Sequence, residues 1–392
     1  MSWQLVTFDE VIADSAFGPR FSGDCYDDNG NVATLRTTDL SLDGSISLES
    51  MPQARSDEDK FRSHFLEVGD LVISRSGRIG TTAIFNGYNK PVLPGAFLIR
   101  FRLDMKKADP LFLRFFFNSD EGQKSLLSVA QGAAQQNINI TNVRKLRVPL
   151  PPLSEQRRVS GLLGCYDDLI ATNQRRIALL EDAARRLYRE WFVHLRFPNH
   201  ELVPVKEGVP EAWTRGSLDE ALFLQRGFDL PSDARLPGEV PIYASTGVNG
   251  FHNEARVRGP GVVTGRSGTL GQVHYVRRDF WPLNTALWVK EFRRVSPLFA
   301  YFMLGDLGLD QFNSGASVPT LDRKVAHQVP VLIPAPEVNA QFDAMAQPLF
   351  DQIEALRDSN AKAAEARDLL LPRLMSGKLD VSSIRLPEEA TT

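Results

Sequence analysis

The amino-acid sequence predicts an α+β protein in which two β-rich domains are separated by two long helices, paired antiparallel as a coiled coil. Two observations support this fold class. Segments of the first half of the chain recur in the same order in the second half, and a heptad pattern of apolar residues follows each β-rich region. The 392 residues are enough for two or more domains. A repeat unit of roughly half the chain predicts two copies of a whole domain, related by pseudo-two-fold symmetry.

The repeat consists of short echoes, each weak alone, that keep their order along the chain. Four pairs of segments correspond: 2–12 with 212–222, 69–85 with 260–276, 109–117 with 296–304, and 139–156 with 319–339. In the second pair, the loop RSGRIG at 75–80 returns as RSGTLG at 266–271. The offset between the copies shrinks along the chain, which indicates shorter loops in the second copy. We therefore interpret the chain as a tandem duplication.

Turn residues and short apolar runs set the limits of the two β-rich domains. Runs such as DLVIS, AFLIRFRL, GVVTG and TALWVK, bounded by Gly, Asn and Asp, predict strands within 1–150 and within 198–335. A helical stretch is expected near the end of each domain, at 110–127 and at 297–312. Each of these stretches opens with a proline, which is favoured in the first turn of a helix.

Two long helices follow the β-rich domains. The first lies within 151–197, where Ser154 after a run of prolines is the expected N-cap of a helix starting at 155. The second lies within 336–378, and the tail 379–392 is expected to be flexible. Apolar residues recur in steps of four and three, which is typical of a coiled-coil seam. The seam positions are Val159, Leu163, Tyr166, Ile170, Asn173, Ile177, Leu180, Ala184, Leu187 and Trp191, then Phe342, Ala346, Leu349, Ile353, Leu356, Asn360, Ala363, Arg367, Leu370 and Leu374.

Each seam contains one asparagine. Asn173 lies two residues before the midpoint of the first seam, and Asn360 lies two residues after the midpoint of the second. In a symmetric antiparallel pair these two positions face each other, so the sequence predicts that the two amides meet. Such a pair would fix the register of the helices at some cost in stability. The alternative is that each amide points to water, because a straight helix drifts away from the heptad.

Sequence motifs of catalysis and of metal binding are missing. The six histidines form no HxH or HxxxH pair, and the sequence contains neither a Walker A loop nor a GxSxG elbow. Cys25 and Cys165 are too few for a disulfide framework, which fits a reducing cytoplasm. The N-terminus does not resemble a secretion signal, and no apolar run is long enough to span a membrane. We therefore expect a non-catalytic cytoplasmic protein without a bound metal.

Basic charge follows the repeat. The net charge of the chain is −3, yet matching segments of the two copies, 71–107 and 255–294, are rich in arginine. A solvated charged surface would explain either run alone. An excess at the same place in both copies favours two equivalent phosphate-binding surfaces, with Arg75 and Arg266 as the leading contacts. The full set of candidate phosphate contacts is Arg75, Arg78, Arg100, Arg102, Arg256, Arg258, Arg266, Arg277 and Arg278.

The segment LPPLSEQRRVSGLLGCYDDLIATNQRRIALLEDAARRLYREWF (150–192) resembles the central spacer helix of the specificity subunits of type I restriction–modification systems. The resemblance covers nearly the whole chain, although Pro334-Ala335-Pro336 and Asn339 depart from the motif in the second copy. It implies that 1–150 and 198–335 are target recognition domains, each reading one half of a bipartite DNA site. It also implies that 151–197 and 336–378 are spacer helices that hold the domains apart.

The resemblance further implies partners and their cofactors. Two modification methyltransferase subunits would dock on the assembly, around Arg175 and Arg176 of the first helix, and restriction motor-endonuclease subunits would join them. S-adenosylmethionine, ATP and Mg²⁺ would belong to those partners rather than to this chain. A second hypothesis, from another class, is an adaptor in which the repeats bind protein ligands and the coiled coil only dimerises. The salt dependence of binding to duplex DNA discriminates the two hypotheses.

Overall fold

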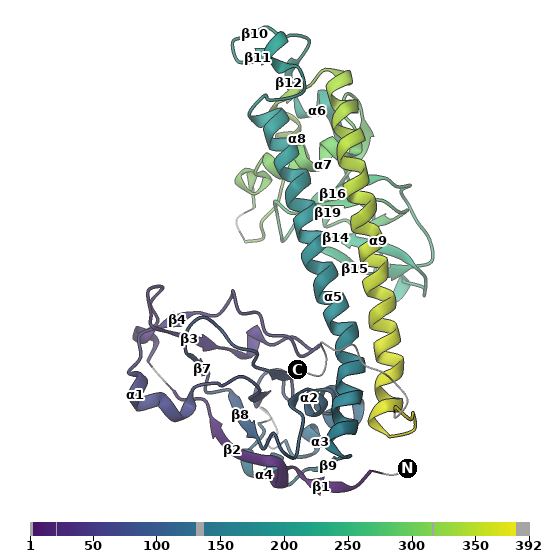
Figure 1. The fold of residues 1–392 in the computed structure, drawn as a ribbon. Helices are drawn as coiled ribbons and strands as arrows, with labels where there is room; N and C mark the ends of the chain where they lie inside the picture. The colour runs from purple at the N-terminus through teal and green to yellow at the C-terminus, as the bar shows by residue number, and fades with distance from the viewer. Residues whose placement is uncertain (1–2, 21, 131–136, 316, 382–392) are drawn as a thin grey trace. The chain divides into compact units, whose positions relative to one another are not determined.

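The structure is a computed structural model and describes residues 3–20, 22–130, 137–315 and 317–381. The chain divides into two compact units. The first contains residues up to 172 together with those from 359 on, and the second contains 173–358. Each unit includes part of both long helices, drawn in teal and yellow in Figure 1. Most of the tail that was expected to be flexible, from 382 on, lies outside the described residues.

The described residues of the first unit form three small sheets. The largest is antiparallel, in the order β2 (Ile12–Phe17), β8 (Leu98–Leu103), β5 (Leu71–Ser74) and β6 (Thr82–Ile84). In the second sheet β3 (Val32–Leu35) pairs antiparallel with β4 (Gln53–Ala54) and parallel with β7 (Val92–Pro94). The third is the pair of β1 (Leu5–Thr7) and β9 (Arg147–Pro149). All residues of β3 and β5 are buried, because their short apolar runs are covered on both faces.

The strand order of the second unit is the same. Its largest sheet runs β13 (Leu222–Arg226), β19 (Ala286–Phe292), β16 (Gly261–Gly265) and β17 (Val273–Val276). In the next sheet β14 (Val240–Ala244) pairs antiparallel with β15 (Gly247–His252) and parallel with β18 (Trp281–Pro282). β12 (Thr214–Ser217) pairs with β20 (Pro330–Ile333). Strands β1 to β9 therefore correspond one to one, in order and partner, with β12 to β20. A hairpin of β10 (Val205–Lys206) and β11 (Val209–Pro210) precedes them.

Each domain carries a helix that opens with proline, as the sequence predicts. Asp109 and Ser296 cap these helices by accepting a hydrogen bond from the backbone N–H of Phe112 (2.8 Å) and of Phe299 (3.1 Å). The prediction of one continuous helix over 110–127 and of another over 297–312 was wrong, because each stretch is divided into two shorter helices. Ser119 ends the first helix and caps a new one, and the second ends before Gly308, whose φ of 58° is left-handed. The short helices are α2 (Pro110–Asn118), α3 (Asp120–Ser128), α7 (Pro297–Asp306), α1 (Glu58–Phe61), α4 (Ile140–Arg144), α6 (Leu218–Ala221) and α8 (Arg323–His327).

The two long helices are α5 (Leu153–Tyr188), continued by a single π turn at Arg189–Val193, and α9 (Pro336–Met375). Because α5 begins at Leu153, Ser154 lies inside its first turn and is not the N-cap. The helices pair antiparallel (Figure 1). In the first unit Arg367 of α9 donates to Asp167 of α5 (2.7 Å), and in the second Arg357 of α9 donates to Glu181 of α5 (2.9 Å). Every seam position named from the sequence is buried or half-buried.

The seam asparagines lie on the inner side of their helices. Asn173 is 3 % exposed, so the alternative that its amide points to water is wrong for this residue. Asn360 is half-buried, and its Nδ2 donates to the backbone carbonyl of Ile170, at 3.4 Å. The amide of Asn360 therefore faces α5. The direct contact between the two side chains stays a prediction.

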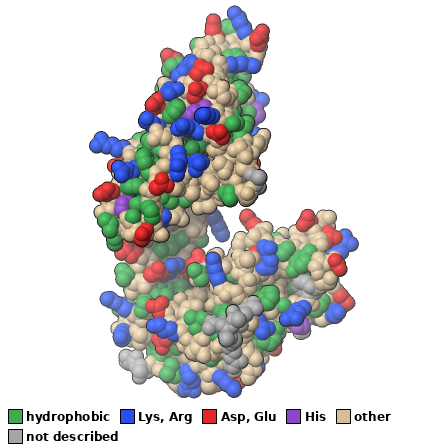
Figure 2. Space-filling model, turned by 180° about the vertical axis from the view of Figure 1, so that it is seen from behind, with side chains coloured by type: hydrophobic (Ala, Val, Ile, Leu, Met, Phe, Trp, Pro, Cys, Tyr) green, Lys and Arg blue, Asp and Glu red, His purple; other side chains and the backbone are tan. Residues whose placement is uncertain are grey.

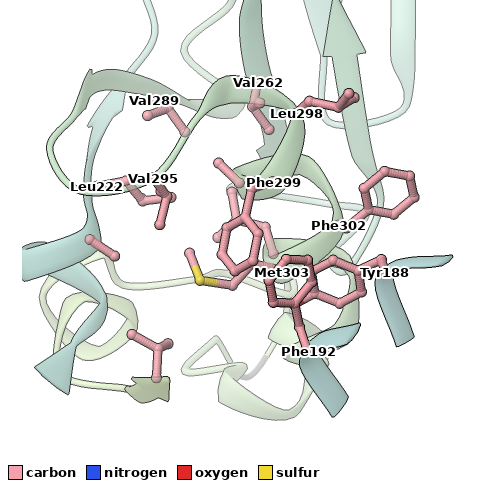
Figure 3. Close-up of a cluster of buried hydrophobic side chains, with 14 of the residues drawn as sticks. Tyr188, Phe192, Leu222, Val262, Val289, Val295, Leu298, Phe299, Phe302 and Met303 are labelled. Carbon is pink, nitrogen blue, oxygen red and sulfur yellow. The ribbon is translucent and has the colours of Figure 1, made fainter. Parts of the chain in front are cut away.

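The C-terminal part of α5 is built into the core of the second unit (Figure 3). The ring of Phe192 meets that of Phe299 of α7 edge to face, with 4.7 Å between centroids, and lies 5.2 Å from the ring of Phe342 of α9. Tyr188 stacks on Phe302 of α7 at 5.5 Å. One aromatic cluster therefore joins both long helices to this domain. In the first unit, Val159 and Leu163 of α5 share a core with Phe112 of α2.

The two units attach their proline-opened helix to the long helices by different chemistry. In the first unit Arg114 of α2 donates to Asp167 of α5 (2.5 Å), the same carboxylate that accepts from Arg367 of α9. The equivalent position of α7 in the second unit is Tyr301. The centroid of its ring lies 5.8 Å from that of Phe350 of α9. A charged junction in one unit thus corresponds to an aromatic junction in the other.

Among the described residues, no helix is both long and apolar enough to cross a membrane.

Candidate nucleic-acid interface

The repeated loop has the same backbone geometry in both units. RSGRIG connects β5 to β6, and RSGTLG connects β16 to β17. Gly77 and Gly268, at the third position of the loop, have φ values of 76° and 90°. Gly80 and Gly271, at the sixth position, both have φ of 82°. These left-handed conformations are disfavoured for residues with a side chain, so both glycines of each loop are needed for the turn.

The first arginine of each loop is held by equivalent backbone hydrogen bonds. The N–H of Arg75 donates to the carbonyl of Phe97 (2.9 Å), and its carbonyl accepts from Ile138 (3.0 Å). The N–H of Arg266 donates to Thr285 (2.9 Å), and its carbonyl accepts from Leu321 (2.8 Å). Each loop is thereby fixed beside the turn that precedes β8 or β19. The backbone positions the arginine, and the guanidinium is not required for the turn.

Five of the candidate arginines keep a positive charge that the protein does not compensate. The guanidinium of Arg75 lies 4.4 Å above the ring of Phe17, and that of Arg256 lies 4.9 Å above the ring of Trp281. Arg266 donates to the backbone carbonyl of Asn284, at 3.1 Å. Arg78 and Arg258 are exposed. None of the five makes an ion pair with another described residue, so both units present cations that can meet phosphate.

Arg100 and Arg102 were predicted as phosphate contacts, and the structure contradicts this for Arg100. Its side chain is completely buried, and it pairs with Asp14 (2.5 Å) across the neighbouring strand. The hydrogen bond from Arg100 lowers the pKa of the Asp14 carboxyl below its usual value. Arg102 is partly exposed, but it forms ion pairs with Asp70 (3.0 Å) and Glu67 (2.8 Å). Its charge is therefore already balanced inside the domain.

Arg277 and Arg278 connect the second domain to a long helix. Arg277 pairs with Asp351 (2.5 Å) and Arg278 with Asp358 (2.6 Å), both on α9. Their prediction as phosphate contacts does not fit these positions, because each guanidinium already has a carboxylate partner. Acidic and basic side chains also lie close together elsewhere on the surface. Figure 2 shows one face of the molecule, where blue Lys and Arg side chains are interspersed with red Asp and Glu side chains. A run of basic residues in the sequence therefore does not by itself show that the surface there carries a net positive charge.

The sequence analysis missed a cleft next to the loop of the first unit. It has a volume of about 580 Å³ and is lined by Pro19, Arg20, Tyr26, Arg36, Thr37, Thr38 and the turn 95–98. Two of its aromatic side chains are exposed, Phe97 at 57 % and Tyr26 at 46 %. Exposed aromatic rings beside Arg20, which makes no ion pair with a described residue, are suited to contacting bases and sugars. The signal in the sequence was an aromatic residue in the turn PGAF, directly before a basic strand.

The remaining candidates are placed as follows. Arg175 and Arg176 are exposed on α5, so both are accessible to a partner. Among the described residues, no group of three or more His, Cys, Asp or Glu side chains could hold a metal ion.

Comparison with known proteins gives consistent results. Residues 2–182 match the family described as the type I restriction modification DNA specificity domain. The chain is 23 % identical over 301 residues to the type I restriction enzyme MjaIX specificity subunit of Methanocaldococcus jannaschii. This match covers 70 % of each of the two chains. It is 25 % identical over 131 residues to the MjaVIII specificity subunit of the same organism, covering 33 % of this chain and 30 % of that protein.

A solved structure shares the fold. The crystal structure of a type I restriction–modification S subunit from M. genitalium superposes with a TM-score of 0.62 at 18 % identity. The match covers 95 % of this chain and 96 % of that one. The similarity in fold therefore extends beyond the part of the chain that the family match covers.

Proposed function

We propose that this chain, whose residues 2–182 match the type I restriction modification DNA specificity domain, is a specificity subunit that recognises a bipartite duplex DNA target, one half-site per β-rich domain. The observation that carries the proposal is the pair of equivalent loops. Each is fixed by the same backbone hydrogen bonds and presents an arginine without a carboxylate partner among the described residues. A chain with two such loops is suited to gripping the DNA backbone twice.

In this proposal the chain itself catalyses nothing. It positions modification methyltransferase subunits and restriction motor-endonuclease subunits on the DNA, and S-adenosylmethionine, ATP and Mg²⁺ are used by those partners. The antiparallel helices act as the spacer between the two half-sites. Two tasks are thus divided within one chain, base recognition in the domains and spacing in the helices.

Replacing Arg75 or Arg266 by alanine is expected to weaken the binding of duplex DNA of any sequence. Each change should also reduce the slope of log affinity against log salt by about one unit, because one phosphate contact is lost. Fluorescence anisotropy of a labelled duplex at several salt concentrations measures both. Arg62→Ala is the control, since this exposed arginine is already paired with Asp59. A change in base preference with an unaltered slope would overturn the assignment to phosphate.

Reversing the charge of Arg175 and Arg176 is expected to reduce co-purification of the methyltransferase subunit while the chain stays folded. Both side chains are exposed and make no ion pair with a described residue, so their loss should not disturb the helix pair. Circular dichroism checks the fold, and size-exclusion chromatography of the mixed subunits measures the complex. Undiminished co-purification would exclude this face of α5 as a docking surface.

Inserting four residues into both α5 and α9 is expected to lengthen the unread spacer of the DNA target. The insertion adds about 6 Å to each helix at 1.5 Å per residue, close to two base pairs at 3.4 Å each. Sequencing of modified bases in cells that carry the chain and its methyltransferase reads the spacer directly. An unchanged spacer, in a folded and active variant, would show that the helices do not set the distance.

A further inference from the structure

β2 in the first unit and its counterpart β13 in the second are each followed by a glycine, Gly18 and Gly227. The N–H of Gly18 donates to the carbonyl of Leu98 and that of Gly227 to the carbonyl of Ala286, both at 3.1 Å. A Cβ atom on Gly18 would lie 2.0 Å from the carbonyl oxygen of Gly95. On Gly227 it would lie 2.2 Å from that of Leu283. Only glycine fits at either place, so the chain leaves both strands along the same path.

Two residues beyond this glycine the two units carry opposite charges. The first unit has Arg20, and the second has Asp229 at the equivalent position. Both side chains are exposed. Arg20 lines the cleft that also contains the exposed rings of Tyr26 and Phe97, and it makes no ion pair with a described residue. Its five N–H donors are therefore available to a ligand.

Asp229 is the centre of a polar cluster. Its Oδ1 accepts from Nη2 of Arg226, at 3.4 Å, and from Nδ2 of Asn284. The backbone carbonyl of Asn284 accepts in turn from Arg266 of the glycine loop, at 3.1 Å. The cluster thus joins the carboxylate to the loop arginine that we assign to phosphate. Because Oδ1 takes both of these hydrogen bonds, Oδ2 keeps its lone pairs for a donor outside the protein.

We propose that Arg20 and Asp229 read one base each, at equivalent positions of the two half-sites, with opposite hydrogen-bonding chemistry. Arg20 donates to O6 and N7 of a guanine, the base that presents two acceptors in the major groove. Asp229 accepts from the exocyclic amino group of a cytosine or an adenine. The two half-sites therefore differ in sequence at this position, even though the two domains share a fold. This inference rests on the proposed function.

Selection from a randomised duplex library by the purified full chain, with and without methyltransferase subunit, tests the proposal. The sequenced bound fraction should contain two half-sites, one with a fixed guanine and the other with a fixed cytosine or adenine. Arg20→Gln should lower the discrimination at the guanine by about ten- to a hundredfold and leave the other half-site unchanged. Asp229→Ala should lower discrimination by a similar factor at the amino base only, because alanine has no acceptor. Asp229→Glu should retain the preference because it keeps a carboxylate.

Matched controls separate a base contact from a general effect of charge. Asp233→Ala removes the same charge from an exposed position four residues further along the chain, and Arg62→Gln is the control for arginine in the first unit. Both should leave all positions unchanged. The inference is overturned if Asp229→Ala or Arg20→Gln changes no base, or weakens every position equally. A wild-type chain that selects no sequence at all would instead refute the proposed function.

Discussion

Replacement of Phe192 by alanine is expected to lower the free energy of unfolding of the second unit by about 3–5 kcal/mol. The side chain is 8 % exposed, and its ring packs against Phe299, Phe342 and Trp213. These neighbours come from the domain and from α9, so no single element can move to fill the cavity that alanine leaves. The loss therefore combines the transfer term with a cavity term.

Hydrogen exchange of the amides of the second unit measures this loss without assuming that the whole chain unfolds in one step. Phe251→Ala is the matched control. This phenylalanine of β15 is 56 % exposed, and its removal should change stability by no more than about 0.5 kcal/mol. Similar effects of the two substitutions would mean that the aromatic cluster does not join α5 to the domain.

Replacement of Asp167 by alanine is expected to destabilise the first unit by about 2–4 kcal/mol. The carboxylate is 21 % exposed and lies between the guanidinium groups of Arg114 and Arg367, whose side chains are 10 % and 18 % exposed. Removing one partner from a largely buried ion pair typically costs about 3–5 kcal/mol, because the remaining charge stays desolvated. Partial exposure lowers the expected figure.

Two further variants make this prediction specific to charge. Asp182→Ala removes an aspartate of the same helix from an exposed pair with Arg186, and should cost at most about 0.5 kcal/mol. The triple variant Arg114→Met, Asp167→Leu, Arg367→Met replaces the whole group by apolar side chains of similar size. It should recover most of the lost stability. If it is as unstable as Asp167→Ala alone, the loss comes from packing and not from stranded charge.

The heptad seam was predictable from the sequence because it depends on spacing alone. Its positions, interrupted by Asn173, Asn360 and Arg367, are all at least half-buried. The sequence could not show which residue of the other helix contacts each of these three polar side chains. Arg367 is a charged residue at a seam position, and Asp167 lies outside the seam positions. They form one ion pair across the helices, which depends on the register between segments two hundred residues apart.

The strands show the same limit. Arg100 lies in a basic run, but β8 is an inner strand of its sheet, and the buried side chain of Arg100 pairs with Asp14 of the neighbouring strand. The carboxylate of Asp14, which accepts a hydrogen bond from Arg100, is 86 positions away in the sequence, and the buried Asp70 lies 4.0 Å from the same guanidinium. Counting charge along a segment therefore overestimated the basic surface. The glycine loops were predictable because left-handed turns require glycine at fixed places, and the arginine beside each turn was therefore identified correctly as a repeated feature.

The two junctions between domain and long helices should respond to heat in opposite ways. Arg114, Asp167 and Arg367 hold the first with charges, and Tyr301 and Phe350 hold the second with rings. Hydration of charged groups becomes less favourable as temperature rises, so an ion-pair junction loses less to water when warm. An apolar junction weakens on cooling, because burial of its surface changes the heat capacity. Cold should loosen the second domain first, and concentrated salt should loosen the first.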